Sequence, residues 1–189
     1  HSKLNEFTNK MALIDVTITP EMLGVLEWPY IHNEWDVPTR LDKIIQHYEI
    51  NARKFPTLIG LNESSSIEIL NLNAISEGIS IVIDHPQWFI REGELVLNIF
   101  RNDLRVASIA FSIAYEGNDI VAYVGALQGI HEGVGSEESL KIFKKLTKDF
   151  YGLRPKSLVL NVFKLIVKKM GVKRVLCVAD EHRHHRHPY

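Results

Sequence analysis

The sequence contains one cysteine, Cys177, which excludes a disulfide within the chain and suits a reducing compartment. Long apolar runs are scarce as well. The uncharged stretch Val106–Tyr115 has only ten residues, whereas a membrane-spanning helix needs about 20. We find no signal peptide, although the chain starts at His1 rather than at Met. These absences argue against a secreted disulfide-rich domain and against an integral membrane protein.

The composition is that of a globular protein. Hydrophobic residues make up 46% and charged residues 24% of the 189 positions, which argues against disordered, collagen-like and coiled-coil chains. A length of roughly 150 residues is usual for one domain. We therefore expect a single domain over residues 1–189, with one sizeable core.

Charge is distributed unevenly along the chain, although the net charge is only −1. Residues 1–140 contain 9 Lys and Arg against 20 Asp and Glu, and residues 141–189 contain 13 against 3. This asymmetry predicts that the C-terminal part meets an anionic partner or docks on the acidic part of the same chain. Docking within the chain is the simpler interpretation, because charged faces usually need no ligand.

The N-terminal part predicts a helical segment at about 20–56. Asp36 fits a helix N-cap, and Pro38 fits the first turn. Apolar residues then recur at helical spacing from Leu41 to Phe55, and Pro56 ends the helix.

The middle of the chain predicts a sheet at about 67–127. Turn residues at 101–103 and 116–119 separate three apolar, β-branched runs, which indicates an antiparallel β-meander because parallel neighbours need a long crossover. The expected strands are Glu94–Phe100, Leu104–Tyr115 and Ile120–Leu127, with a weaker one at Ile67–Leu72. Asp84-His85-Pro86 resembles a base beside its orienting acid, but we interpret it as a turn before an edge strand.

The region at about 136–179 predicts a helix pair followed by a strand. Ser136 can cap the first helix, whose expected apolar face is Leu140, Phe143, Leu146 and Phe150 and whose basic stripe is Lys141, Lys144, Lys145 and Lys148. The second helix, about 156–170, is apolar nearly all round, so we expect Leu160, Val162 and Leu165 to be buried. The strand Val175–Ala179 completes the sheet and holds Cys177 as a buried, unreactive thiol. The fold class is α+β, with the antiparallel meander in a mixed sheet packed with helices.

Several short motifs occur in an order that resembles the bacterial VirK/YbjX family. They are Trp28-Pro29-Tyr30, Arg40 with His47-Tyr48, Glu92-Gly93-Glu94-Leu95, Leu127-Gln128-Gly129, Tyr151-Gly152-Leu153-Arg154-Pro155-Lys156, and the run Gly171–Ala179 before a histidine-containing segment. The Gly-Leu-Arg-Pro-Lys element is the most specific of them. Family members continue beyond this segment, so the chain resembles a truncated member.

The resemblance implies a role in virulence and in the response to envelope stress or antimicrobial peptides, exerted by binding a partner or an anionic ligand. It implies no catalytic residues, because none is established for the family. On this basis we expect a cytoplasmic protein that can also bind peripherally to the inner membrane.

The loops after two expected elements predict an anion site. Gln128 and Gly129 follow a strand, and Arg154, Lys156 and Ser157 open a buried helix. Free N–H groups at a helix start, together with nearby cations, suit a phosphate. GNAT-type acetyltransferases hold coenzyme A in such an arrangement and have a similar meander, which makes an acyltransferase using acetyl-CoA or another acyl-CoA the alternative function. An ordinary turn between two helices is the competing interpretation, because Pro155 lacks an N–H.

The terminal run Glu181–His187 is rich in histidine, but Arg183 and Arg186 oppose a dication and no second ligand pair is evident. We therefore predict no metal there. His182 is the candidate ligand-binding residue of the run, because it follows the C-terminal end of a strand.

The basic stripe is the surface on which a macromolecular partner is considered. The basic stripe lacks interleaved aromatic residues, so sequence-specific nucleic acid is not expected. A helix with lysines beside Phe and Leu can instead lie on an anionic membrane surface.

Overall fold

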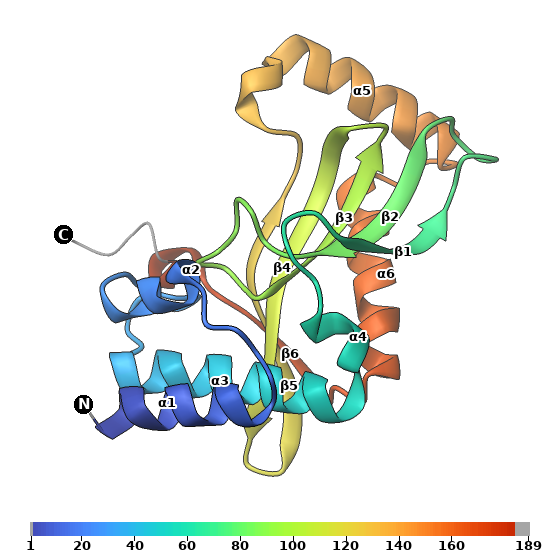
Figure 1. Ribbon diagram of the computed structural model, residues 1–189. Coiled ribbons are helices and arrows are strands. Elements are labelled where there is room, and N and C mark those ends of the chain that lie inside the picture. Colours follow the sequence, from blue (N-terminus) through green and yellow to red (C-terminus); the bar gives the residue numbers. More distant parts are fainter. Residues whose placement is uncertain (1, 184–189) are drawn as a thin grey trace.

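The computed structural model describes residues 2–183 and is organised around a six-stranded sheet whose strands lie side by side in sequence order (Figure 1). The strands are β1 (Ser66–Asn71), β2 (Ile79–Asp84), β3 (Leu95–Arg101), β4 (Leu104–Glu116), β5 (Asp119–Gln128) and β6 (Arg174–Cys177). The α-helices are α1 (Ser2–Leu13), α2 (Pro20–Leu23), α3 (Val37–Lys54), α4 (Pro56–Ile59), α5 (Ser136–Asp149) and α6 (Pro155–Lys169). Short 3₁₀ helices are η1 (Gly24–Leu26), η2 (Glu132–Val134) and η3 (Asp180–His182).

The expected meander is confirmed. Strands β1 to β5 pair antiparallel, with short turns between β3, β4 and β5, and β6 joins β5 in parallel after the two long helices. The fold is therefore α+β with a mixed sheet, as the sequence predicts. Strand β2 was not expected, and it makes β3 an internal strand. The prediction of an edge strand after Asp84-His85-Pro86 is therefore wrong, and Asp84 instead ends β2.

Helices cover both faces of the sheet. Helix α3 packs on β4 and carries α1 on its outer side, whereas α6 packs across β3, β4 and β5 on the other side (Figure 1). Helix α3 begins where expected, since the Asp36 carboxylate accepts the N–H of Thr39 at 2.9 Å. Among residues 2–183, no helix has both the length and the apolar composition needed to cross a membrane.

The C-terminal helices are less buried than their sequences predict. Helix α6 buries Val162, but Leu165 is 64% exposed, because only one face of the helix meets the sheet. In α5, Leu146 is fully buried and Leu140 is 52% exposed, so the expected apolar face is correct only in part. Gly135, rather than Ser136, is the N-cap residue of α5.

The prediction of a buried Cys177 is wrong. Strand β6 has β5 as its only neighbour in the described sheet, and the Cys177 side chain is exposed. Basic residues around this strand pair with the acidic part of the chain. Arg174 lies 2.7 Å from Glu116, and Arg183 lies 3.8 Å from Glu92.

Candidate functional site

The parallel strands β5 and β6 separate part of the way along β5. Their pairing ends at Val124↔Cys177, and in the described part of the chain the last bond between them runs from the N–H of Val178 to the carbonyl of Val124. The register between β4 and β5 then skips Gly125, which forms a β-bulge. Beyond the bulge, β5 continues along β4 to the exposed Gln128. One edge of this stretch therefore has no strand partner among the described residues.

The predicted anion loop lies at the end of this stretch. A Cβ atom on Gly129 would lie 3.1 Å from Cε of Lys156, so the start of α6 meets the end of β5. Arg154 is the N-cap residue, and Arg154, Lys156 and Ser157 are exposed. The N–H of Leu158 already bonds to the carbonyl of Arg154, which leaves the preceding N–H groups of Lys156 and Ser157 without a partner inside the helix. The structure thus brings Gly129 to Lys156, and the predicted residues Gln128, Arg154 and Ser157 lie within two positions of these residues in the chain.

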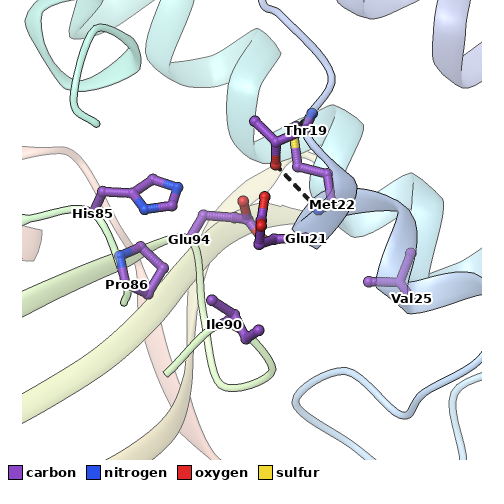
Figure 2. Close-up of a pocket in the computed structure, with 8 residues that line it drawn as sticks. All are labelled: Thr19, Glu21, Met22, Val25, His85, Pro86, Ile90 and Glu94. Atoms are coloured by element: carbon purple, nitrogen blue, oxygen red, sulfur yellow. Dashed lines mark hydrogen bonds between the residues drawn. The ribbon is translucent and has the colours of Figure 1, made fainter. Parts of the chain in front are cut away.

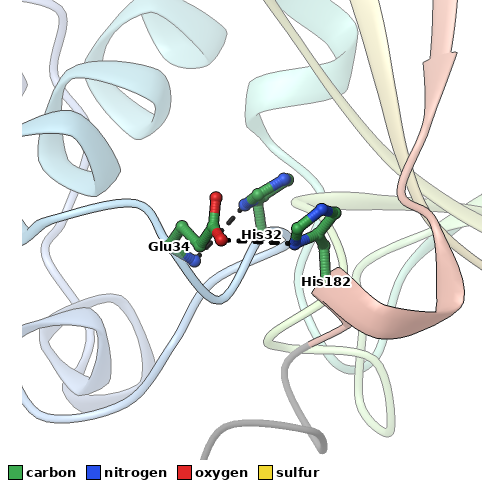
Figure 3. Close-up of side chains that lie close together, drawn as sticks. All are labelled: His32, Glu34 and His182. Carbon is green, nitrogen blue, oxygen red and sulfur yellow. Dashed lines mark hydrogen bonds and ion pairs between the residues drawn. The ribbon is translucent and has the colours of Figure 1, made fainter.

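His182 contacts a different part of the chain. Its ring stacks on that of His32, with centroids 4.4 Å apart, and its Nδ1 lies 3.7 Å from a carboxylate oxygen of Glu34 (Figure 3). His32 and Glu34 precede α3 and carry no local signal of a site in the sequence. The rest of the predicted histidine run, from residue 184 onward, lies outside the described residues.

The segment Glu92-Gly93-Glu94 lies against the bulge. A Cβ atom on Gly125 would lie 2.2 Å from the carbonyl oxygen of Glu92, and one on Gly93 would lie 2.4 Å from the backbone nitrogen of Phe111. Glycine at both positions therefore lets the chain that enters β3 lie directly on β4 and β5. Two carboxyl groups are brought close to the point where β5 and β6 separate.

Glu94 is buried within a network of hydroxyl groups. Tyr48 donates a hydrogen bond to Oε2 of Glu94 at 3.0 Å, and Ser112 Oγ accepts the Glu94 N–H at 2.9 Å. The hydroxyls of Tyr30 and Ser112 are 2.6 Å apart. Burial raises the pKa of the Glu94 carboxyl, and the hydrogen bonds from Tyr48 and Tyr30 oppose this effect. The network holds Glu94 in one orientation.

Glu92 is suited to proton transfer near neutral pH. Burial raises its pKa to about 7, although the Arg183 guanidinium lowers it in part. A general base works best when its pKa lies near the working pH. The motif Glu92-Gly93-Glu94-Leu95 carries part of the family resemblance, but nothing in its local pattern indicates that both carboxyls are buried, so sequence reasoning missed them.

A small pocket borders Glu94, and a larger cavity adjoins this pocket. Glu94 borders a small pocket with Glu21, His85 and Ile90 (Figure 2), and Glu21 and Ile90 also line an adjoining cavity of about 180 Å³ beside Trp28. Nδ1 of His85 is buried and has no hydrogen-bond partner within residues 2–183. The cavity combines apolar walls with a few polar groups, which is usual for small-molecule sites.

Asp84 does not orient His85 as in a catalytic pair. Its carboxylate accepts a hydrogen bond from Asn98 at 2.8 Å and lies 3.5 Å from Arg105. Burial raises its pKa to about 6, with Arg105 and Asn98 acting in the opposite direction. These contacts tie β2 to β3 and β4, which is a structural role.

Comparison with known proteins identifies the family. The chain matches the family described as "Protein of unknown function (DUF535)" over residues 2–189 and belongs to it. This is the VirK/YbjX family that the motifs resemble. No curated protein and no solved structure matches the chain.

Proposed function

We propose that this DUF535 protein binds an acyl-coenzyme A between β5 and β6 and transfers the acyl group to an amine, in a GNAT-like manner. The observation that carries the proposal is the loss of the β6 partner at the Gly125 bulge. It leaves a strand edge that leads from two buried carboxyls to the cationic start of α6.

The two ends of this edge suit the two ends of such a ligand. From Gly125 to Gly129 the strand covers on the order of 13 Å, and the amide groups of an extended ligand arm can bond to the strand edge as an added strand would. The phosphates then meet Arg154, Lys156 and the free N–H groups of α6, where cations and the helix dipole act on the same point. The acyl end lies near Gly125 and Glu92.

Glu92 supplies the proton acceptor in this scheme. The amine nitrogen attacks the thioester carbonyl carbon, and a C–N bond forms while the C–S bond breaks. Before the attack, the Glu92 carboxylate takes one proton from the ammonium form of the acceptor, and in the tetrahedral intermediate the nitrogen gives a second proton to the departing sulfur, which leaves as the coenzyme A thiol. The cavity beside Trp28, which adjoins the pocket at Glu94, accommodates the acceptor, with Glu21 as a partner for a cationic amine.

Calorimetric titration of the full chain with acetyl-CoA tests the binding site. Saturable binding is expected, and Arg154→Ala is expected to weaken it by at least tenfold. The matched control replaces Lys141, Lys144 and Lys145 of the exposed α5 stripe by Gln and should leave the affinity unchanged at physiological salt, because separate surface charges contribute little. Loss of binding in the control with retention in Arg154→Ala would refute the site.

Release of the coenzyme A thiol in the presence of primary amines tests the reaction. The assay uses a Cys177→Ser background, because Cys177 itself would react with the thiol reagent. Glu92→Gln should bind acetyl-CoA normally and lose turnover. Turnover equal to that of the parent chain would remove Glu92 from the mechanism.

A second function is favoured by the surface of α5. Leu140 is 52% exposed next to exposed lysines at 141, 144, 145 and 148. Lysines beside an apolar side chain suit an anionic membrane surface, which agrees with the envelope-stress role that the family resemblance implies for a cytoplasmic protein peripheral to the inner membrane. Co-sedimentation with phosphatidylglycerol vesicles tests this function. Binding should fall in the triple Gln variant and in Leu140→Ser, and unchanged binding in both would exclude it.

A further inference from the structure

Three potential metal ligands from opposite ends of the chain meet on one side of the molecule. His32, Glu34 and His182 each offer a ligand atom, and these atoms all lie within 4.8 Å of one another (Figure 3). His182 follows β6, whereas His32 and Glu34 precede α3, so only the tertiary structure brings them together.

Backbone contacts hold the two ligand-bearing segments in place. His32 forms an antiparallel β-bridge with Arg183, and the N–H of Asn33 donates to the carbonyl of His182 at 2.8 Å. The Asn33 side-chain amide donates to the carbonyl of Glu181 at 3.1 Å. Because the bonds join the neighbours of each ligand, they set the spacing of the histidines before any ion binds, which lowers the ordering cost of binding.

The side chains have the chemistry and the freedom that a zinc site requires. Nδ1 of His32 carries a lone pair, since it accepts the N–H of Glu34 at 3.3 Å, and Nδ1 of His182 lies 3.7 Å from Oε1 of Glu34. Two imidazole nitrogens and one carboxylate oxygen, with solvent as the fourth ligand, form a common zinc ligand set. Donor atoms around zinc lie roughly 3.3 Å apart, given zinc–ligand distances near 2 Å. The stacked rings must rotate to reach this geometry, since imidazole lone pairs lie in the ring plane.

We infer that His32, Glu34 and His182 form a site for a divalent transition-metal ion, with Zn²⁺ as the best fit. The Glu34 side chain is 71% exposed and that of His182 is 35% exposed, so both can turn toward the ion. A bound ion would fix the segment after β6 to the segment before α3. The expectation of no metal at the histidine run rests on the lack of a second ligand pair in the sequence pattern, and His32 and Glu34 are placed beside His182 as such a pair. The inference is independent of the proposed acyl transfer.

Competition titration with ZnCl₂ against a chromogenic chelator tests the site. The full chain is used with His184, His185 and His187 replaced by Gln, so that these neighbouring imidazoles do not contribute. One Zn²⁺ per chain is expected, and MgCl₂ should not compete, because Mg²⁺ prefers oxygen ligands. Weakening by at least tenfold is expected in His182→Ala, His32→Ala and Glu34→Gln.

Two controls separate loss of a ligand from general effects. His131→Ala removes an exposed histidine elsewhere and should leave the affinity unchanged. Glu34→Gln alters an exposed side chain and should keep the parent circular dichroism spectrum, so a weaker affinity in this variant reports ligation rather than unfolding. Co²⁺ should give the intense visible absorption of a four-coordinate site, and His182→Ala should abolish it. The inference would be overturned if the chain did not bind one Zn²⁺ stoichiometrically, or if all three ligand variants bound Zn²⁺ with the affinity of the parent chain.

Discussion

Gly125 and Glu92 are in backbone contact at the β5 bulge, where a Cβ atom on Gly125 would lie 2.2 Å from the carbonyl oxygen of Glu92 and 2.6 Å from its Cα. The contact joins the strand that loses its β6 partner to the segment that carries both buried carboxyls. A glycine is therefore required for reasons of space, and the bulge and the carboxyl segment form one structural unit.

Gly125→Ala should lower the free energy of unfolding by roughly 2–3 kcal/mol, because backbone atoms cannot move aside as a flexible side chain can. The matched control is Gly60→Ala, since a Cβ atom there meets nothing within 4 Å. This control should change the stability by less than about 0.5 kcal/mol. Urea unfolding of both variants measures the difference. Equal free energies of unfolding for the two variants would show that β5 and the segment at Glu92 can move apart without loss of stability.

His47 should make the protein sensitive to acid. Its Nδ1 accepts the N–H of Ile113 at 3.1 Å, and burial lowers its pKa from 6.5 to about 3. Between these values the unfolded chain binds a proton that the folded chain does not, so stability falls as the pH drops from about 6.5 toward 3. The loss is of the order of 5 kcal/mol at most, at about 1.4 kcal/mol for each tenfold change in the proton equilibrium.

The variant His47→Gln isolates this effect, because its side-chain oxygen can still accept a backbone N–H. Its unfolding free energy should depend less on pH than that of the parent chain between pH 6.5 and 4. Urea unfolding at several pH values provides the measurement. Parallel profiles for the two proteins would assign the acid sensitivity to other groups.

Glu94→Gln should raise stability more at pH 8 than at pH 5. Burial raises the pKa of Glu94, so the folded state holds a proton that the unfolded state releases above about pH 4.5. Stability contributed by the neutral carboxyl is therefore lost as the pH rises. Glutamine has no such proton and can still accept the hydrogen bond from Tyr48. Denaturant midpoints at both pH values test this, and a larger gain at pH 5 than at pH 8 would contradict it.

Gly129→Val should reduce acetyl-CoA affinity by roughly tenfold without changing the melting temperature, if the proposed site is correct. A Cβ atom at this position would lie 3.1 Å from both Lys156 Cε and Phe143 Cζ, and these are flexible side-chain atoms that can shift. The shift moves the Lys156 ammonium away from the loop. Calorimetry and a thermal melt provide the two readouts. Unchanged affinity would place the phosphate elsewhere.

Cys177 should react with a thiol reagent in the folded protein at a rate close to that of the unfolded chain. Its side chain is exposed on β6, which has one strand neighbour in the described sheet. Absorbance after addition of Ellman's reagent, with and without denaturant, gives both rates. Reaction only after unfolding would show that the thiol is covered in solution.

Local patterns predicted the parts of the fold that depend on neighbours in the sequence. Apolar, β-branched runs separated by short turns predicted β3, β4 and β5, and Asp36 and Pro56 predicted the ends of α3.

The tertiary structure alone decided which side chains are buried and which distant ones meet. Glu92 and Glu94 are buried because Gly93 and Gly125 let backbones approach closely, which no periodicity in the sequence reports. Cys177 is exposed although its strand is apolar, because β6 lies at the end of the strand order. His32 and His182 stack because a β-bridge joins their segments. The sequence therefore determined the helices and strands that depend on a local hydrophobic period and on turn residues. Long-range packing determined which charged side chains are buried and where the candidate sites form.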